Sequence, residues 1–214
     1  MEDIKVIVNQ LGSFGTNCYF VINMKTREAV IIDPADDPRF ICNQLENREL
    51  RCAGILLTHG HVDHIGAVSG LRQILGHATK VYACKEEEEV LSNPRLNLSS
   101  MFGDVMTLKA DEWLKDGQTL ELLDTKITCI AVPGHTKGGM CYYFEEEKLL
   151  FAGDTLFASS IGRSDFPTGD GEVLVESIRE KLFTLPNDTQ VYPGHNENTS
   201  IVREKECNPY VGGM

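Results

Sequence analysis

The feature that most constrains this chain is a cluster of polar side chains at residues 58–66, Thr-His-Gly-His-Val-Asp-His-Ile-Gly. It follows a short apolar run, which predicts a strand leading into a turn and then a helix. In extended backbone, alternate side chains lie on one face, so we expect His59, His61 and Asp63 to point the same way. His64 begins the predicted helix. Four metal-type side chains within six residues predict a pocket for one or two cations.

Three further predicted strands end in the same kind of side chain. The strand at 126–132 is followed by Pro-Gly-His, the strand at 148–152 by Gly-Asp, and the strand at 189–192 by Pro-Gly-His. Ligands of open α/β sheets gather at such strand ends. The side chains at these ends are His135, Asp154 and His195. Five of the six histidines lie in such turns and only His77 lies elsewhere, which favours a shared site over isolated structural histidines.

The overall composition is that of a globular protein. Hydrophobic residues make up 42% and charged residues 24% of 214 residues, and strands followed by a helix occur twice without a linker. We therefore expect one α/β domain over residues 1–214. No apolar run approaches the roughly 20 residues that span a membrane, and the N-terminus lacks the pattern of a signal peptide. These features predict a cytoplasmic protein without a membrane partner, and they do not determine its oligomeric state.

Charge and cysteine usage narrow the partners further. The formal net charge is −12, and such an acidic chain would repel a phosphate backbone, so nucleic acid is excluded as a general partner. Seven scattered cysteines form no C-x-x-C pair and predict buried, reduced thiols rather than a disulfide framework. A small-molecule substrate fits these properties best.

Seven ligands are too many for one tetrahedral ion and suit two ions about 3.5–4 Å apart. The expected sites are His59, His61 and His135 for one ion and Asp63, His64 and His195 for the other, with Asp154 as the bridging carboxylate. Imidazole and carboxylate ligands favour two zinc ions and also accept iron or manganese. A water on such ions has a pKa near about 7, so we expect a hydroxide nucleophile that Asp63 also orients as a catalytic residue.

These motifs resemble the metallo-β-lactamase superfamily over nearly the whole chain. The matching segments are Thr-His-Gly-His-Val-Asp-His-Ile-Gly, Pro-Gly-His-Thr, Gly-Asp-Thr-Leu-Phe and Tyr-Pro-Gly-His. The resemblance implies a four-layer αββα sandwich with the metals at one edge of the facing sheets. Residues 162–166, Gly-Arg-Ser-Asp-Phe, and the segment around Asn208 look like the glyoxalase II-like branch (hydroxyacylglutathione hydrolase-like), whose members hydrolyse thioesters such as S-D-lactoylglutathione.

Arg163 is at the position where that branch often presents a basic residue to the substrate, and an ion pair with Asp165 is an equally good interpretation. Full-length glyoxalase II has an added helical C-terminal domain that grips glutathione, whereas only a short segment follows His195 here. The resemblance therefore implies a thioester hydrolase that binds glutathione differently or acts on another thioester.

Other functions share the same motifs. A mononuclear iron persulfide dioxygenase would use three ligands that match His59, His135 and Asp154, and a hydrolase of another ester or a lactone is a further alternative. Metal analysis distinguishes the dioxygenase from the thioester hydrolase. Two zinc-type ions per chain indicate hydrolysis, whereas one iron with oxygen consumption indicates the dioxygenase.

Three features outside the motifs carry open interpretations. Asp33 either caps the turn before Pro34 or accepts a hydrogen bond from a metal-bound histidine. The acidic run at 86–89 predicts a solvated helix face. The irregular segment at 92–112, with apolar anchors, is either a lid or rim of the site or a packed connector.

Overall fold

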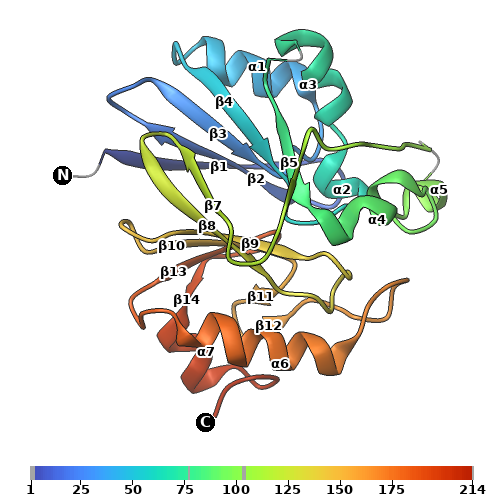
Figure 1. Ribbon diagram of the computed structural model, residues 1–214, viewed down its shortest axis with the longest axis vertical. Coiled ribbons are helices and arrows are strands. Elements are labelled where there is room, and N and C mark those ends of the chain that lie inside the picture. The colour runs from blue at the N-terminus through green and yellow to red at the C-terminus, as the bar shows by residue number, and fades with distance from the viewer. Residues whose placement is uncertain (1–2, 77, 103–104, 214) are drawn as a thin grey trace.

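Two six-stranded sheets pack face to face, with helices covering both outer faces (Figure 1). This computed structural model describes residues 3–76, 78–102 and 105–213, so His77 lies outside the described residues. From top to bottom in Figure 1 the layers are α1 (Pro38–Glu46) with α3 (Val68–Leu75), the first sheet, the second sheet, and α6 (Gly171–Lys181) with α7 (Ile201–Cys207). The predicted α/β class and four-layer αββα sandwich are confirmed.

The first sheet has the strand order β1-β2-β3-β4-β5-β6. Its strands are β1 (Ile4–Leu11), β2 (Thr16–Asn23), β3 (Glu28–Ile32), β4 (Arg51–Leu56), β5 (Val81–Cys84) and β6 (Glu112–Leu114). β1, β2 and β3 pair antiparallel, whereas β3 to β6 run parallel. The carboxyl ends of β3, β4 and β5 therefore meet at one edge.

The second sheet has the order β14-β13-β10-β9-β8-β7. Its strands are β7 (Thr119–Leu122), β8 (Thr125–Ala131), β9 (Met140–Phe144), β10 (Leu149–Gly153), β13 (Gln190–Pro193) and β14 (Thr199–Ser200). β10 and β13 are parallel neighbours, so the turns after them emerge side by side. A small hairpin of β11 (Leu156–Phe157) and β12 (Ser160–Ile161) follows β10.

Three apolar layers hold the four structural layers together. Along β2, Cys18 and Phe20 pack toward the helices α1 and α3, and Tyr19 and Val21 pack toward the second sheet. This is the period-2 alternation of a strand buried on both faces. A third cluster, including Leu150 of β10, packs under α6 and α7. Every layer boundary is thus closed by side chains from strands with no solvent face.

The helix predicted after the opening motif is divided in the structure. Two helices replace it, α2 (Val62–Ile65) and α3, separated by Gly66 and Ala67. A Cβ at Gly66 would lie 2.2 Å from the Ala35 carbonyl oxygen, so the chain packs tightly against the turn after β3. Ile74, near the end of α3, is 49% exposed.

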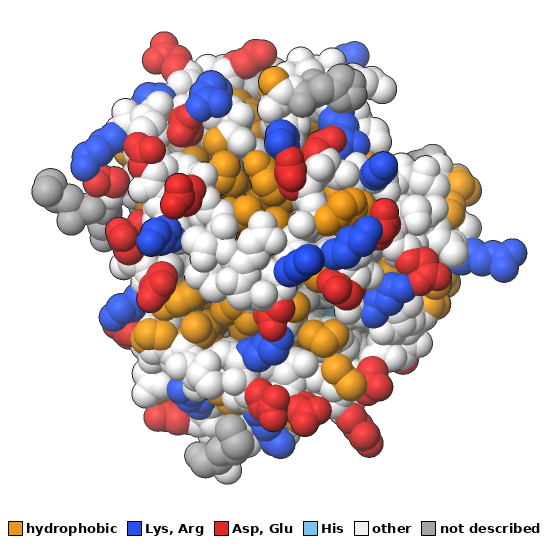
Figure 2. All heavy atoms as spheres, viewed as in Figure 1, with side chains coloured by type: hydrophobic (Ala, Val, Ile, Leu, Met, Phe, Trp, Pro, Cys, Tyr) orange, Lys and Arg blue, Asp and Glu red, His pale blue; other side chains and the backbone are white. Residues whose placement is uncertain are grey.

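The surface drawn in Figure 2 carries charged side chains of both signs. On the face drawn in Figure 2, basic side chains are interspersed with acidic ones and form no continuous basic stripe. Among the described residues, no helix is long and apolar enough to cross a membrane. The seven cysteines are all unpaired, and five of them are buried, as the scattered spacing predicts.

Candidate metal centre

The turn after β4 carries His59 and His61, and a buried carboxylate anchors its start. The Thr58 N–H donates to Asp33 Oδ1 at 2.8 Å, and the Thr58 hydroxyl donates to Asp33 Oδ2 at 2.6 Å. Met140 of β9 donates its N–H to the Thr58 carbonyl at 2.8 Å. Both imidazoles are buried. The start of the turn that carries the two imidazole rings is therefore fixed to both sheets.

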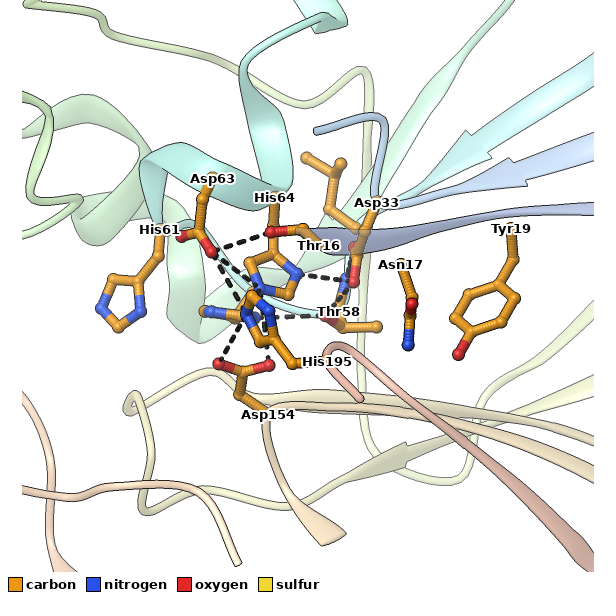
Figure 3. Close-up of polar contacts among 12 residues, drawn as sticks. Thr16, Asn17, Tyr19, Asp33, Thr58, His61, Asp63, His64, Asp154 and His195 are labelled. Carbon is orange, nitrogen blue, oxygen red and sulfur yellow. Dashed lines mark hydrogen bonds and ion pairs between the residues drawn. The ribbon is translucent and has the colours of Figure 1, made fainter. Parts of the chain in front are cut away.

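Asp63 and His64 lie on α2, which begins at Val62. The prediction that Asp63 continues the extended segment is wrong, because the chain has already turned into the helix. The Thr16 hydroxyl donates to Asp63 Oδ2 at 3.0 Å. His64 Nδ1 lies 2.9 Å from Asp33 Oδ2, so its N–H donates there and Nε2 faces the site (Figure 3). Of the two roles considered for Asp33, the hydrogen bond to a histidine is observed.

The second sheet supplies His135 after β8, Asp154 after β10 and His195 after β13. His135 Nδ1 lies 2.7 Å from the Arg163 carbonyl oxygen. That contact makes Nδ1 the protonated nitrogen, so Nε2 faces the other histidines with its lone pair. The turns of the two sheets face each other across one edge of the sandwich, as expected for strands that end at the same side.

Glycines allow these turns to approach closely. A Cβ at Gly194 would lie 2.2 Å from Asp154 Oδ1 and 2.7 Å from His64 Cε1. Gly153 has φ of +50°, and a Cβ there would lie 2.3 Å from the Thr58 hydroxyl oxygen. No other residue fits at either position without displacing the site.

The first group of side chains is His59, His61 and His135. His135 Nε2 lies 3.2 Å from His59 Nε2 and 3.0 Å from His61 Nδ1. Ligands bound at about 2.0–2.1 Å around a tetrahedral ion lie about 3.3 Å from one another. The observed spacing of the three nitrogens therefore matches the coordination shell of a single metal ion.

The second group is Asp63, His64 and His195 (Figure 3). His195 Nε2 lies 3.2 Å from Asp63 Oδ2 and 3.4 Å from His64 Nε2. His64 Nε2 lies 3.5 Å from Asp63 Oδ2. These separations again match one tetrahedral shell.

Asp154 lies between the two groups. Its Oδ1 is 3.4 Å from His64 Nε2, and its Oδ2 is 3.7 Å from His135 Nε2 and 3.6 Å from His195 Nε2. Oδ1 is buried without a hydrogen-bond partner among the described residues, and an uncompensated buried carboxylate oxygen is costly. A cation would satisfy it. The donor set therefore fits two divalent ions, and the assignment of all seven side chains as ligands stays a prediction.

Burial prepares the first group for metal binding. Burial, together with the charges of the neighbouring histidines, lowers the pKa of His61 to about 3 and holds the pKa of His59 well below its usual range. Neutral imidazoles have a free lone pair at neutral pH, as a metal ligand requires.

The second group is acidic enough to require a cation. Burial would lower the pKa of His64, but the carboxylates of Asp63, Asp154 and Asp33 overcome it and raise the pKa to about 10. Burial would raise the pKa of Asp63, whereas the charges of His64 and His195 hold it below its usual range. Without a metal ion, a proton on His64 compensates these carboxylates. A divalent ion can take over this role.

Glu87 was not identified from the sequence as part of the site, because the acidic run at 86–89 predicts a solvated face. Its carboxylate is 1% exposed and accepts hydrogen bonds from the Gly60 N–H at 2.8 Å and the Thr136 hydroxyl at 3.0 Å. It therefore connects the turn of His59 and His61 to the turn of His135. The prediction fails here because only the packing of the two halves encloses this one member of the run.

A cavity of about 840 Å3 opens above the two groups. Its lining includes His61, Asp63, His135, Asp154 and His195 from the site, and Phe14, Leu98, Phe102, Phe157, Ala158, Ser160, Ile161, Arg163, Phe166, Asn196 and Glu197 around it. Arg163 donates from Nε and Nη2 to Asp165 at 2.7 and 2.6 Å. Its guanidinium also lies over the Phe166 ring, 3.9 Å from the centroid. The ion pair considered from the sequence is observed at the cavity wall.

The segment at 92–112 serves both of the roles considered for it. Asn97 is fully buried, and its carbonyl accepts the Val62 N–H at 2.9 Å at the start of α2. By contrast, Phe102 at the end of α5 (Ser99–Phe102) is 52% exposed and lines the cavity. The described parts of the segment are therefore a packed connector at one end and a rim of the site at the other. Residues 103 and 104 lie outside the described residues.

Comparison with known proteins places this site among metal-dependent enzymes. A family model described as the metallo-beta-lactamase superfamily matches residues 11–195. A probable metallo-hydrolase of Streptococcus pyogenes serotype M6 is 36% identical over 92% of this chain and 85% of its own length. The hydroxyacylglutathione hydrolase GloC of Haemophilus influenzae is 34% identical over 93% of this chain and 94% of its own.

Solved structures agree with these relatives. The BLEG-1 B3 metallo-beta-lactamase superposes with a TM-score of 0.91 at 37% identity, covering 98% of this chain and 100% of that one. TTHA1623, solved in a di-iron-bound form, has a TM-score of 0.84 at 30% identity and covers 95% of this chain and 99% of that one.

Proposed function

The chain belongs to the metallo-beta-lactamase superfamily, and on this premise we propose that it is a glyoxalase II-like thioester hydrolase that uses two divalent metal ions, zinc by preference. The observation that carries the proposal is the position of Asp154, whose carboxylate lies 3.7 Å from His135 of the first group and 3.4 and 3.6 Å from His64 and His195 of the second. A carboxylate within reach of both histidine groups suits two ions, whereas a one-ion site would use Asp154 with one group only. Two ions bridged by it are the arrangement that activates water for attack on a carbonyl.

Each group would hold one ion. His59, His61 and His135 would bind the first, Asp63, His64 and His195 the second, and Asp154 would bind both. When bound, the ions lower the pKa of a water molecule to about 7 and polarise the substrate carbonyl. Iron and manganese accept the same ligands, and the di-iron-bound neighbour supports iron as the alternative to zinc.

The chain's own residues set the geometry around the reacting atoms. Asp63 lines the cavity and is fixed by the Thr16 hydroxyl, so it can accept a hydrogen bond from the attacking water and orient it. Asp33 holds the His64 ring through Nδ1. Arg163 at the cavity wall would contact the substrate.

The thioester substrate is supported by the hydroxyacylglutathione hydrolase relative, which matches nearly the full length of both chains. The B3 metallo-beta-lactamase neighbour supports a β-lactam, which is a cyclic amide, as a second candidate. Both substrate classes need water attack on a carbonyl next to a leaving group, so the metal centre alone does not separate them.

The test is metal analysis joined to a substrate panel. Purified protein should contain about two divalent ions per chain and hydrolyse a thioester such as S-D-lactoylglutathione faster than a lactone or a β-lactam. A preference for the β-lactam would favour the second candidate, β-lactam hydrolysis, over thioester hydrolysis. One iron per chain, with oxygen consumed on glutathione persulfide, would instead establish the persulfide dioxygenase and overturn the proposal.

A further inference from the structure

Two half-exposed phenylalanines lie at the mouth of the cavity. Phe14, in the turn between β1 and β2, and Phe102, at the end of α5, pack edge to face with centroids 4.9 Å apart. They are 49% and 52% exposed. We call Phe14 and Phe102 the aromatic rim. Large apolar side chains exposed together usually mark a binding surface, and these two come from distant parts of the chain.

The apolar surface continues from the rim down to the metal centre. Phe166 packs against the His61 ring at 5.8 Å between centroids, and Phe157 and Ile161 reach the same cavity from the β11–β12 hairpin. Figure 2 shows hydrophobic side chains at the surface near α5, where the rim begins. A substrate whose carbonyl reaches the metal centre therefore extends between apolar walls.

The charges of the cavity do not suit a substrate with an anionic group such as glutathione. Among the described residues that line it, Arg163 is the only Lys or Arg, and Asp165 already accepts two of its N–H groups. Outside the candidate metal ligands, the other charged residue of the lining is the acidic Glu197. Glutathione carries two carboxylates, and burying either without a free cation is costly. Neutral, apolar groups meet no such cost and gain contact area.

We infer that the preferred substrate is a thioester with an uncharged, apolar group, seated between the aromatic rim and the wall formed by Phe157 and Phe166. The inference rests on the proposed thioester hydrolysis and narrows its substrate class. Phe14 and Phe102 act as specificity-determining residues, because they contact the substrate away from the scissile bond.

The experiment measures kcat/KM for thioesters of one neutral thiol, N-acetylcysteamine, with acetyl, hexanoyl and phenylacetyl groups, alongside S-D-lactoylglutathione. All are alkyl thioesters, so the leaving group has similar chemistry throughout. We expect the hexanoyl or phenylacetyl ester to exceed S-D-lactoylglutathione by at least about tenfold, a difference that burial of a few methylene groups can supply.

The rim is tested by Phe14→Ala and Phe102→Ala. Each should lower the ratio of kcat/KM for the phenylacetyl ester over the acetyl ester by about fivefold or more, with metal content and melting temperature unchanged. Met101→Ala is the matched control, because Met101 is 67% exposed on the same helix but does not line the cavity. It should leave the ratio unchanged.

The outcomes separate the inference from the proposed function. If S-D-lactoylglutathione is preferred and the rim variants keep the ratio, the inference is overturned while thioester hydrolysis stands. If no thioester is cleaved, the proposed function fails. If the rim variants abolish self-association in sedimentation experiments without changing the ratio, the rim is a contact between two copies of the chain and the inference is again overturned.

Discussion

The floor of the cavity, formed by the candidate metal ligands, and its mouth, formed by the aromatic rim and the wall at Arg163 and Phe166, differ in burial. At the floor, ligand candidates such as His64 are buried, and some of them are oriented by a further buried group, as Asp33 orients that ring. At the mouth, Phe14 and Phe102 are half exposed and pack against each other edge to face. The floor has one possible arrangement, whereas the mouth can change in sequence without disturbing it. Chemistry should therefore depend on the floor, and substrate choice on the mouth.

The largest effect is expected for Asp154→Ala at the floor. Removing the carboxylate that faces both groups should release at least one ion and lower kcat/KM by at least about 100-fold. Metal content by mass spectrometry and kinetics on a cleaved thioester measure both effects, and circular dichroism checks the fold. Two tightly bound ions with full activity would contradict the bridging role of Asp154. They would also contradict the view that the chemistry depends on the floor of the cavity.

Asp33→Asn tests the hydrogen bond between Asp33 and the His64 ring. The amide keeps the shape but loses the charge that holds the His64 Nδ1–H, so we expect metal affinity to fall about 10–100-fold, first at the group formed by Asp63, His64 and His195. Competition with a metal chelator measures the affinity of each site. The matched control is Asp36→Asn on the exposed turn nearby, which should bind both ions as the original chain does. Equal affinities in the two variants would show that Asp33 is only a turn residue.

Glu87→Gln should change how stability depends on pH. Burial raises the pKa of Glu87 to about 7 from 4.5, although the Gly60 N–H, the Thr136 hydroxyl and the Lys137 charge lower it. The folded chain therefore holds this proton between about pH 4.5 and 7 while the unfolded chain releases it. Consequently the free energy of unfolding falls as pH rises through this window, by about 3 kcal/mol in total.

Glutamine does not titrate, so the Glu87→Gln variant should lack this part of the slope. Urea unfolding of metal-free protein at several pH values measures it, and the contributions of the histidines cancel in the difference between the two proteins. Glu89→Gln is the control, since that side chain is exposed and pairs with Lys137. An unchanged slope in Glu87→Gln would mean that the carboxylate is ionised in the folded protein at all these pH values.

The smallest effect is expected for Arg163→Ala at the mouth. The carbonyl oxygen that holds His135 belongs to the backbone and remains, so metal content and kcat should change little. Loss of the side chain beside Phe166 should raise KM about three- to tenfold. Arg39→Ala, an exposed arginine on α1, serves as control. A large loss of kcat would show that the wall takes part in the reaction and would weaken the contrast between floor and mouth.

Local sequence patterns were enough to find the residues of the floor. His59 and His61 follow an apolar strand, and His135, Asp154 and His195 each follow another, so side-chain type and strand periodicity together indicate a shared site at the strand ends. The sandwich itself was implied by the resemblance to the metallo-β-lactamase superfamily. The glycines before Asp154 and His195 belong to the same signal, because only they allow the turns to approach. Each of these strand-and-turn patterns is encoded within a few consecutive residues and can be detected without knowing the fold.

Contacts between distant residues were decided only by the tertiary structure. Glu87 reads as one of four similar glutamates, and only the meeting of the Gly60 and Thr136 turns buries it. Likewise, Phe14 and Phe102 are ordinary apolar residues until the two segments pack together. Periodicity reports which face of one element is apolar, but it carries no information about which other element covers that face. The sequence alone therefore determined the metal-type chemistry and the sandwich, and the packing of the two halves decided what supports the site and what surrounds the substrate.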